Sequence, residues 1–376
     1  MIYKNAVIFY QEHFIKGWFK VEKDRFTQVS EGVTDEEGVD LQGLCVIPGL
    51  VDIHTHGCMG NDFSDGNIDG LKEMGRYYAE NGITSFAPAS MTLGYDTLDK
   101  AFRKAKEYRD AETPGRARLT GIHMEGPYLS YEKRGAQNPA YLRKPDFDEF
   151  LKLNEGCGDI IRIVDIAAEL EGSVDFAGKA SEICTVSLAH SNCSYEEAAS
   201  LYNAGCSHLT HMYNAMPSLQ HREPGPIGAA SERDNVTAEL ICDGYHVHPS
   251  AVRASFKLFP HRICLISDSL RCCGMPDGEY ILGEQQVYLR EGVARLENGT
   301  IAGSASNLYE CMLNAIRFGI SKEEALYAAT LLPSMIVHDK NIGAIEAGRY
   351  ADFIICDENL LPKEVYLGGE KRFTNN

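Results

Sequence analysis

The hydrophobic pattern divides the chain into a long middle and two similar ends. Over residues 1–48, short runs of β-forming residues alternate with turns, as at 6–9 and 17–21, and no stretch has a helical period. Residues 343–376 repeat this pattern, most clearly at 351–356. We therefore expect a small β-sandwich domain built from both termini, with residues 1–48 as its N-terminal part and residues 343–376 as its C-terminal part.

The middle of the chain, residues 49–342, alternates apolar runs with amphipathic stretches. Eight apolar runs predict buried strands, which end near His54, Ser90, Glu125, Ala168, His190, His211, Asp243 and Asp268. Amphipathic stretches that predict helices follow most of them, among them 68–81, 95–108, 194–203 and 304–318. Ser194, followed three residues later by Glu197, is a typical helix start. Eight strand–helix repeats predict an α/β fold, a TIM-like (β/α)8 barrel over residues 49–342.

Two segments interrupt this alternation. Residues 214–228 contain three prolines and predict a long loop, and residues 274–303 predict β-hairpins inserted after the eighth strand. A doubly wound parallel sheet is the alternative to a barrel. It would not readily place polar residues at the ends of so many non-adjacent strands, so we favour the barrel.

The composition is that of a soluble globular protein, with 44% hydrophobic and 24% charged residues. A formal net charge of −18 opposes a nucleic-acid partner, whose phosphates need a basic surface. No apolar run is long enough to cross a bilayer, and the N-terminus does not have the pattern of a signal peptide. The 12 cysteines are scattered and form no Cys-x-x-Cys pair, so we expect reduced core residues and a cytoplasmic protein.

Residues that can bind a metal or move a proton end several of the predicted strands. His54 and His56 end the first strand, and because residues i and i+2 of a strand point to the same face, both imidazoles can aim at one point. The third, fifth, sixth and eighth strands end in Glu125, His190, His211 and Asp268, and the seventh is followed by His246.

The polar side chains at the ends of these strands need a common partner. In a (β/α)8 barrel the C-terminal ends of the strands face one active site, and a buried strand that ends in an unpaired His or Asp is destabilised. A divalent metal ion would satisfy several ends together, but His and carboxylate ligands do not choose between zinc, iron and other ions. His123 and His208 are expected to point away from this site. Surface or core positions are expected for His13, His248, His261 and His338.

Short motifs run in order through nearly the whole chain. They are Pro-Gly-Leu-Val-Asp-Ile-His-Thr-His-Gly (48–57), His-Met-Glu-Gly-Pro-Tyr (123–128), Leu-Ala-His-Ser (188–191), Leu-Thr-His-Met-Tyr-Asn-Ala-Met (209–216), His-Arg-Glu-Pro-Gly (221–225), Asp-Gly-Tyr-His-Val (243–247), Ser-Asp-Ser (267–269), Ala-Gly-Ser (302–304) and Gly-Arg-Tyr-Ala-Asp (348–352). The set resembles the N-acetylglucosamine-6-phosphate deacetylase family of the amidohydrolase superfamily. The Glu-Gly-Pro and Asn-Ala-Met motifs are specific to that family, whereas the His-x-His pair is not.

The resemblance implies a metal centre. Glu125, His190 and His211 would bind one divalent ion. His54 and His56 would complete a second site, with Glu125 as the bridge. Some family members lack the His-x-His pair and use one metal, so the resemblance implies one or two ions per subunit, with zinc and iron as the leading candidates.

The resemblance also implies roles around the substrate. Asp268 would be the general base and then the general acid, and His246 would hydrogen-bond the acetyl carbonyl oxygen. The sugar phosphate would be held by Asn214, the Ala215 backbone, His221 and Arg222. Gln137 stands where many members have His; it can donate and accept hydrogen bonds but cannot carry a charge. In the family the arginine reaches over from the neighbouring subunit, which implies a homodimer.

The implied reaction is metal-dependent hydrolysis of the acetamide of N-acetyl-D-glucosamine 6-phosphate to D-glucosamine 6-phosphate and acetate, in amino-sugar catabolism or recycling. The alternative is an amidohydrolase that deacylates another N-acyl amino sugar phosphate or an N-acyl amino acid. A non-enzymatic assembly protein on the same scaffold is a third hypothesis. Such a protein would be expected to lose ligands, whereas every expected ligand is present in this chain.

Overall fold

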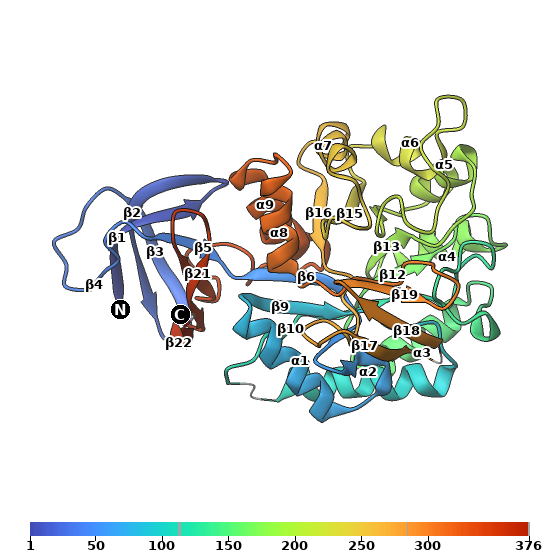
Figure 1. The fold of residues 1–376 in the computed structure, drawn as a ribbon, viewed down its shortest axis with the longest axis horizontal. Coiled ribbons are helices and arrows are strands. Elements are labelled where there is room, and N and C mark those ends of the chain that lie inside the picture. Colours follow the sequence, from blue (N-terminus) through green and yellow to red (C-terminus); the bar gives the residue numbers. More distant parts are fainter. Residues whose placement is uncertain (112–113, 284, 375–376) are drawn as a thin grey trace.

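Both ends of the chain contribute to one sheet in the computed structural model, which describes residues 1–111, 114–283 and 285–374 (Figure 1). In this part of the chain the sheet has eight strands, in the order β22-β21-β20-β5-β1-β2-β3 with β4 paired to β1. Its strands are β1 (Ile2–Tyr10), β2 (His13–Glu22), β3 (Arg25–Glu31), β4 (Val39–Asp40), β5 (Cys45–Pro48), β20 (Phe353–Cys356), β21 (Pro362–Leu367) and β22 (Glu370–Thr374). Strands β5 and β20 join the two ends, with Ile47 opposite Ile354.

This terminal sheet has a hydrophobic core of its own. The ring of Phe353 stacks on that of Tyr366 with centroids 4.3 Å apart, and the rings of Tyr3 and Phe19 stack at 4.8 Å. These aromatic pairs bury large apolar areas in the sheet. Strands from both ends of the chain therefore share one sheet, whereas the domain of residues 1–48 and 343–376 and its division into the two layers of a sandwich stay predictions.

The middle of the chain is an α/β fold with parallel sheets. Among the described residues, one sheet has three strands in the order β10-β9-β6 and another has six in the order β11 to β16. They are β6 (Leu50–Thr55), β9 (Ile83–Pro88), β10 (Arg118–Leu119), β11 (Ile122–Met124), β12 (Ile161–Ile166), β13 (Thr185–Leu188), β14 (His208–Leu209), β15 (Thr237–Ile241) and β16 (Ile263–Ile266). The six-stranded sheet is a curled half-barrel.

The two parallel sheets approach each other at isolated bridges. Thr55 bridges Ser269 beside β6 and β16, and Ala89 bridges His123 beside β9 and β11. The predicted α/β class is confirmed. The complete barrel stays a prediction at this point.

Helices cover the outside of the parallel sheets (Figure 1). They are α1 (Ile68–Glu80), α2 (Tyr95–Asp110), α3 (Phe147–Gly156), α4 (Ser173–Ala180), α5 (Tyr195–Asn203), α6 (Gly225–Ser231), α7 (Pro249–Leu258), α8 (Leu308–Arg317), α9 (Lys322–Ala329) and α10 (Leu331–Ile336), with short 3-10 turns η1 (Phe63–Asp65) and η2 (Pro139–Tyr141). The predicted capping box of α5 is present: Glu197 N donates to Ser194 Oγ, and Ser194 N donates to Glu197 Oε2.

Two predicted boundaries were wrong. Helix α8 begins at Leu308 rather than Ser304, because Ser304 bridges Ser269 and Asn307 caps the helix. The loop predicted over 214–228 ends early, because α6 begins at Gly225. Between 274 and 303 the predicted hairpins are present as β17 (Gly278–Leu282), β18 (Gln285–Arg290) and β19 (Val293–Leu296), with residue 284 outside the described residues. The antiparallel pair of β7 (Gly57–Cys58) and β8 (Asn61–Asp62) follows β6, the strand of the His-x-His motif.

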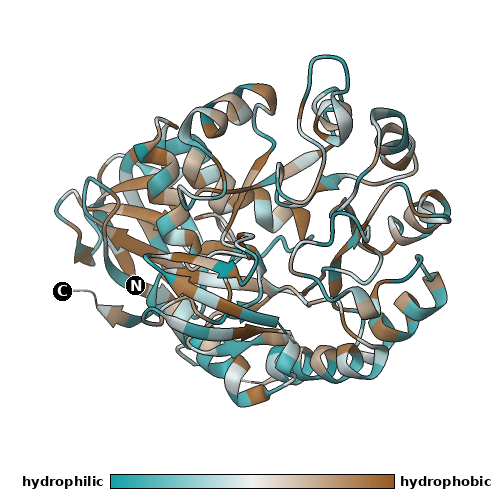
Figure 2. Cartoon of the chain, turned by 45° about the vertical axis from the view of Figure 1, so that its right-hand side comes forward, coloured by the Kyte–Doolittle hydropathy of each residue, from teal (hydrophilic) through white to brown (hydrophobic). Residues whose placement is uncertain are grey.

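Hydrophobic residues lie mainly along the interior strands and on the inner sides of the helices (Figure 2). All 12 cysteines lie in the described part of the chain, where each is buried and unpaired. This confirms that they are core residues. Among the described residues, no helix is long and apolar enough to cross a membrane.

Candidate active site

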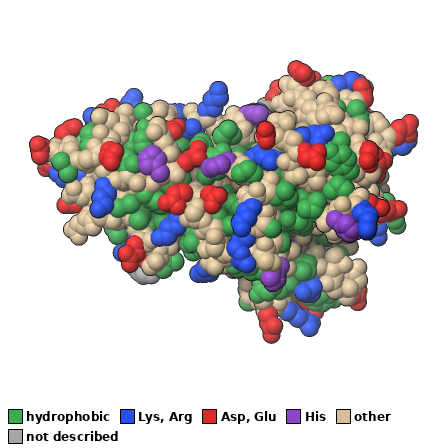
Figure 3. Space-filling view, turned by 90° about the horizontal axis from the view of Figure 1, so that it is seen from above, with side chains coloured by type: hydrophobic (Ala, Val, Ile, Leu, Met, Phe, Trp, Pro, Cys, Tyr) green, Lys and Arg blue, Asp and Glu red, His purple; other side chains and the backbone are tan. Residues whose placement is uncertain are grey.

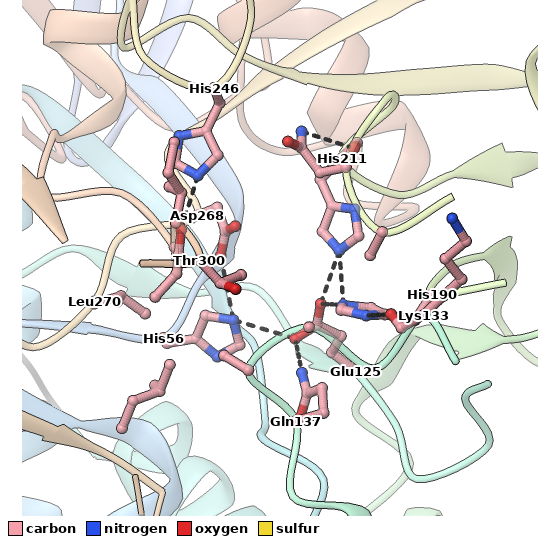
Figure 4. A pocket seen from close by; sticks show the side chains of 18 of the residues that line it. His56, Glu125, Lys133, Gln137, His190, His211, His246, Asp268, Leu270 and Thr300 are labelled. Carbon is pink, nitrogen blue, oxygen red and sulfur yellow. Dashed lines mark hydrogen bonds and ion pairs between the residues drawn. The ribbon is translucent and has the colours of Figure 1, made fainter. Parts of the chain in front are cut away.

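A cavity of about 490 Å³ opens where the parallel strands end. Its walls include most of the predicted site residues: His56, Glu125, Gln137, His190, His211, Asn214, Ala215, His246 and Asp268. In Figure 4 the labelled histidines and carboxylates converge on one space from several strands. His54 lies just outside this wall and is fully buried, while His221 and Arg222 are exposed on the surface and do not line the cavity.

Glu125, His190 and His211 form a compact group. Glu125 Oε1 lies 3.1 Å from His190 Nε2 and 3.1 Å from His211 Nε2, and the two imidazole nitrogens are 3.0 Å apart. One ligand atom from each residue lies within 4.8 Å of the others. Oxygen and imidazole donors at such separations can share one divalent ion.

His54, His56 and Asp268 form a second group beside the first. His56 Nε2 lies 3.2 Å from Glu125 Oε2 and 3.3 Å from Asp268 Oδ1, so the two groups meet at Glu125. His54 Nε2 lies 3.7 Å from both Glu125 Oε1 and Asp268 Oδ1. Among the described residues this buried nitrogen has no hydrogen-bond partner. A buried, unpaired nitrogen that faces two carboxylates fits a cation ligand.

Charged groups in the two clusters shift one another's pKa values. Burial raises the pKa of Glu125, but hydrogen bonds from His190, His211 and His56 outweigh it and hold the pKa well below its usual value. Burial lowers the pKa of His211, but Glu125 outweighs it and raises the pKa to about 9. Without metal, Glu125 is therefore ionised and His211 carries a proton, which a bound cation would replace.

Asp268 and His246 face the same space from the segments that follow β16 and β15. Burial raises the pKa of Asp268, but the hydrogen bond with His56 and the electrostatic effects of His54 and His56 together outweigh burial and lower the pKa, so the carboxylate is ionised. His246 Nδ1 lies 2.7 Å from Asp243 Oδ2, and its Nε2 lies 2.8 Å from the Ala302 carbonyl oxygen. Burial lowers the pKa of His246, and Asp243 more than reverses this, so the pKa is raised.

Gln137 holds the Glu125 carboxylate. It is 3% exposed; its Nε2 donates to Glu125 Oε2 at 2.7 Å, and its Oε1 accepts from Thr92 N at 2.7 Å. The predicted contact of Gln137 with a sugar is not tested by these distances. They give the residue a second role, which is to orient the carboxylate shared by both groups.

Only some of the residues predicted to hold a phosphate line the cavity. Asn214 and Ala215 line the cavity, and Asn214 Nδ2 donates to the His211 carbonyl oxygen at 3.1 Å. Arg222 instead lines a separate surface cavity, between the segment after Met216 and the start of α5. Within one chain, the structure does not bring His221 and Arg222 to the site.

Three charged residues near the cavity were missed. Lys133 lines the cavity, and its carbonyl oxygen accepts from His190 Nδ1 at 2.8 Å. Asp165 lies 3.0 Å from His123 Nε2, which turns that imidazole away from the cavity, as predicted. Glu239 lies beneath the site on β15. Its sequence signal was a lone Glu inside an apolar strand, where a charge needs buried partners.

Glu239 collects hydrogen bonds from the histidine-bearing strands. Its Oε2 lies 2.9 Å from His54 Nδ1 and accepts from His211 N at 3.0 Å, and its Oε1 lies 3.2 Å from His208 Nε2. Burial raises the pKa of Glu239, but His54 and His208 hold it well below its usual value. His208 points away from Glu125, as predicted, because it faces this carboxylate.

Known proteins resemble this chain in sequence and in fold. The Amidohydrolase family model matches residues 45–374. The chain is 31% identical over 334 residues to N-acetylgalactosamine-6-phosphate deacetylase of Escherichia coli O157:H7, covering 88% of each protein. It is 32% identical over 350 residues to N-acetylglucosamine-6-phosphate deacetylase of Lysinibacillus sphaericus, covering 92% of this chain and 89% of that protein. A mutant N-acetyl-D-glucosamine-6-phosphate deacetylase from Mycobacterium smegmatis, in complex with N-acetyl-D-glucosamine-6-phosphate, matches with a TM-score of 0.94 at 28% identity, covering 100% of this chain and 99% of that one.

Proposed function

This chain belongs to the amidohydrolase family and stands among its N-acetylglucosamine-6-phosphate deacetylases, and on that premise we propose that it hydrolyses the acetamide of N-acetyl-D-glucosamine 6-phosphate to D-glucosamine 6-phosphate and acetate. The observation that carries the proposal is the cavity in which Glu125, His190 and His211 lie within 4.8 Å of one another, beside Asp268 and His246. Donors of this kind suit a hydrolytic metal site.

One or two divalent ions would be held by these donors. Glu125, His190 and His211 would hold the first, and His54 and His56 would complete a second with Glu125 shared. A bound ion would supply Lewis-acid activation of water and of the acetamide carbonyl at neutral pH. Zinc and iron both suit this donor set.

Two residues would carry the proton and the developing charge. The water oxygen attacks the acetyl carbon, and Asp268, ionised and 3.3 Å from His56 Nε2, accepts the water's proton. His246 donates Nε2–H to the acetyl oxygen in place of the Ala302 carbonyl oxygen, and this hydrogen bond strengthens as negative charge develops. The C–N bond then breaks, and the proton on Asp268 passes to the departing amine, so acetate and a free amino sugar are formed.

The phosphate of the substrate would be bound by two subunits. Asn214 and the Ala215 backbone line the cavity of their own chain, and Gln137, which lines the same cavity, would contact the sugar. His221 and Arg222 are exposed and outside this cavity, which supports a homodimer in which Arg222 reaches the neighbouring site. A planar guanidinium can bind two phosphate oxygens at once.

The same proposal extends to the architecture and the compartment. The bridges Thr55–Ser269 and Ala89–His123 support closure of the parallel sheets into a TIM-like (β/α)8 barrel over residues 49–342. The separate aromatic core of the terminal sheet supports a sandwich domain formed by residues 1–48 and 343–376. Twelve buried, unpaired cysteines support a reducing compartment, the cytoplasm.

Nucleic acid is not an expected partner. The net charge is −18, and on the face shown in Figure 3, Lys and Arg are interspersed with Asp and Glu rather than gathered in a basic field. The proposed partners are therefore a small phosphosugar and a second copy of the chain.

A substrate panel tests the proposal. Acetate release is measured from N-acetylglucosamine 6-phosphate, N-acetylgalactosamine 6-phosphate, unphosphorylated N-acetylglucosamine and an N-acetyl amino acid, with metal content determined on the same sample. We expect the highest kcat/KM with N-acetylglucosamine 6-phosphate and a clear loss without the phosphate. Preference for the C4 epimer would favour the activity named for the Escherichia coli relative. Acetate release from none of these compounds by metal-loaded protein would refute the proposed function.

A further inference from the structure

Glu239 is a buried carboxylate that the reaction just described does not use. It lies in the middle of β15 and is 0% exposed. Its shortest side-chain contact, 2.9 Å, runs from Oε2 to His54 Nδ1, across 185 positions of sequence. The other imidazole nitrogen of His54 points into the metal-type cluster, 3.7 Å from both Glu125 Oε1 and Asp268 Oδ1.

The chemistry of this contact selects one form of His54. A carboxylate only accepts hydrogen bonds, so the proton of the neutral imidazole lies on Nδ1 and the lone pair lies on Nε2. Nε2 is the buried nitrogen that has no hydrogen-bond partner among the described residues. The contact with Glu239 therefore aims the lone pair of His54 at the position where a second cation would bind.

The other imidazoles of the cluster are held differently. His56 Nδ1 lies 3.1 Å from the Ala89 carbonyl oxygen, and His190 Nδ1 lies 2.8 Å from the Lys133 carbonyl oxygen. Both holders are neutral backbone groups, whereas Glu239 is a side-chain carboxylate. A carboxylate makes the opposite nitrogen of an imidazole a more basic ligand, and loss of such a partner typically weakens metal binding by about 10–100-fold.

We propose that Glu239 is a positioning residue that fixes the tautomer and ring orientation of His54 and thereby sets the affinity of the second cation position. The inference rests on the proposed metal-dependent function, but its test reads metal binding rather than turnover. If Glu239 only paired buried histidines, its contact with His208 would matter for metal binding as much as its contact with His54, since His208 Nε2 lies 3.2 Å from Glu239 Oε1.

The test compares Glu239→Gln with His54→Asn and His208→Asn. Each metal-free dimer is titrated with Zn²⁺ by calorimetry, and bound zinc is counted after dialysis. In Glu239→Gln we expect the second equivalent to bind about 10–100-fold more weakly while the first stays within about threefold of wild type. Its titration should match that of His54→Asn, and adding Glu239→Gln to His54→Asn should change nothing further. His208→Asn, the matched control, should keep both equivalents.

Several results would overturn this assignment. They are unchanged binding of both equivalents in Glu239→Gln, loss of both together, or equal weakening of the second equivalent in His208→Asn. If Glu239→Gln does not fold, Glu239→Asp keeps the charge but withdraws it from His54, and it should weaken the second equivalent selectively. A wild-type protein that binds one zinc yet releases acetate would refute the inference and leave the proposed function intact. Two bound zinc ions without acetate release would refute the proposed function and leave the inference intact.

Discussion

At the scale of the residue, several site side chains sit on strained backbone. His190, His211 and Asp268 have φ values of 42°, 31° and 47°, in the left-handed region that non-glycine residues avoid. Such a conformation destabilises each residue by about 1–2 kcal/mol. It turns the side chain out of the strand direction at the point where the strand ends. Burial of all three residues in one cluster offsets this strain and fixes their directions.

Asp268→Asn should remove turnover without removing the cluster. The amide keeps the shape of the carboxylate but cannot accept a proton from water, so kcat should fall by about 10²–10⁴-fold. The circular dichroism spectrum and the metal content should stay close to those of the wild type, which controls for loss of the fold or of the cation. A variant that keeps near-normal kcat would show that Asp268 is not the base.

Cation binding should release protons at neutral pH. Burial lowers the pKa of His211 but Glu125 raises it to about 9, so this imidazole carries a proton at pH 7 when no metal is bound. A metal ion requires the neutral ring, so binding should release about one proton from this residue, and the affinity should rise with pH up to about 9. Calorimetry in buffers of different ionisation enthalpy measures this release. An apparent enthalpy that is independent of the buffer would contradict it.

At the scale of the element, the strands are short, and the candidate site residues lie at their C-terminal ends. Strand β14 has two residues and β11 has three, yet Glu125 directly follows β11 and His211 lies two residues after the end of β14. Parallel neighbours such as β13 and β14 bring residues from distant parts of the chain to one edge of the sheet.

The capping box of α5 should contribute measurably to stability. Ser194→Ala removes the hydroxyl that accepts from Glu197 N, so the free energy of unfolding should fall by about 1 kcal/mol. Ser200→Ala is the matched control, because Ser200 is exposed inside the same helix and, within the described part of the chain, its hydroxyl bonds only the Glu196 carbonyl oxygen. That variant should stay within about 0.5 kcal/mol of wild type. Urea titration measures both values, and equal losses would show that the box contributes nothing specific.

At the scale of the molecule, the terminal sheet is tied to the α/β part. Asp352, just before β20, accepts from Arg118 Nε of β10 at 3.0 Å, and its backbone oxygen accepts from Gly49 N. The first and last parts of the chain therefore meet beside the strand that carries His54. The exposed Arg222 does not line the cavity of its own chain, and its proposed action on a neighbouring subunit is open to a direct test.

Mixed dimers test whether Arg222 works across subunits. Arg222→Ala and Asp268→Asn subunits are mixed in equal amounts. If Arg222 acts in trans, a hybrid dimer has one intact site, made of Asp268 from one subunit and Arg222 from the other. Random mixing makes half of the dimers hybrids, so about a quarter of wild-type sites should return in a two-fold dimer. Hybrids confirmed by mass that are no more active than the parent variants would exclude action in trans.

Local patterns in the sequence were enough for much of this protein. The helical period of the apolar residues and the capping residues predicted α1, α2 and α5 within a few residues, because a helix and its cap form between neighbours in sequence. Polar residues at the ends of apolar runs predicted Glu125 and His211 as neighbours, because parallel strands deliver their ends to one edge. The motif order then identified the family.

Only the tertiary structure decided the contacts between distant residues. Three of them join residues that no periodic pattern in the sequence connects. Strand β5 pairs with β20, Gln137 donates a hydrogen bond to Glu125, and Glu239 contacts His54. A buried charge in a strand signals that a partner exists but does not say which of several histidines it is. That choice depends on the packing of the whole fold, because a carboxylate and an imidazole select each other by distance and burial rather than by spacing along the chain.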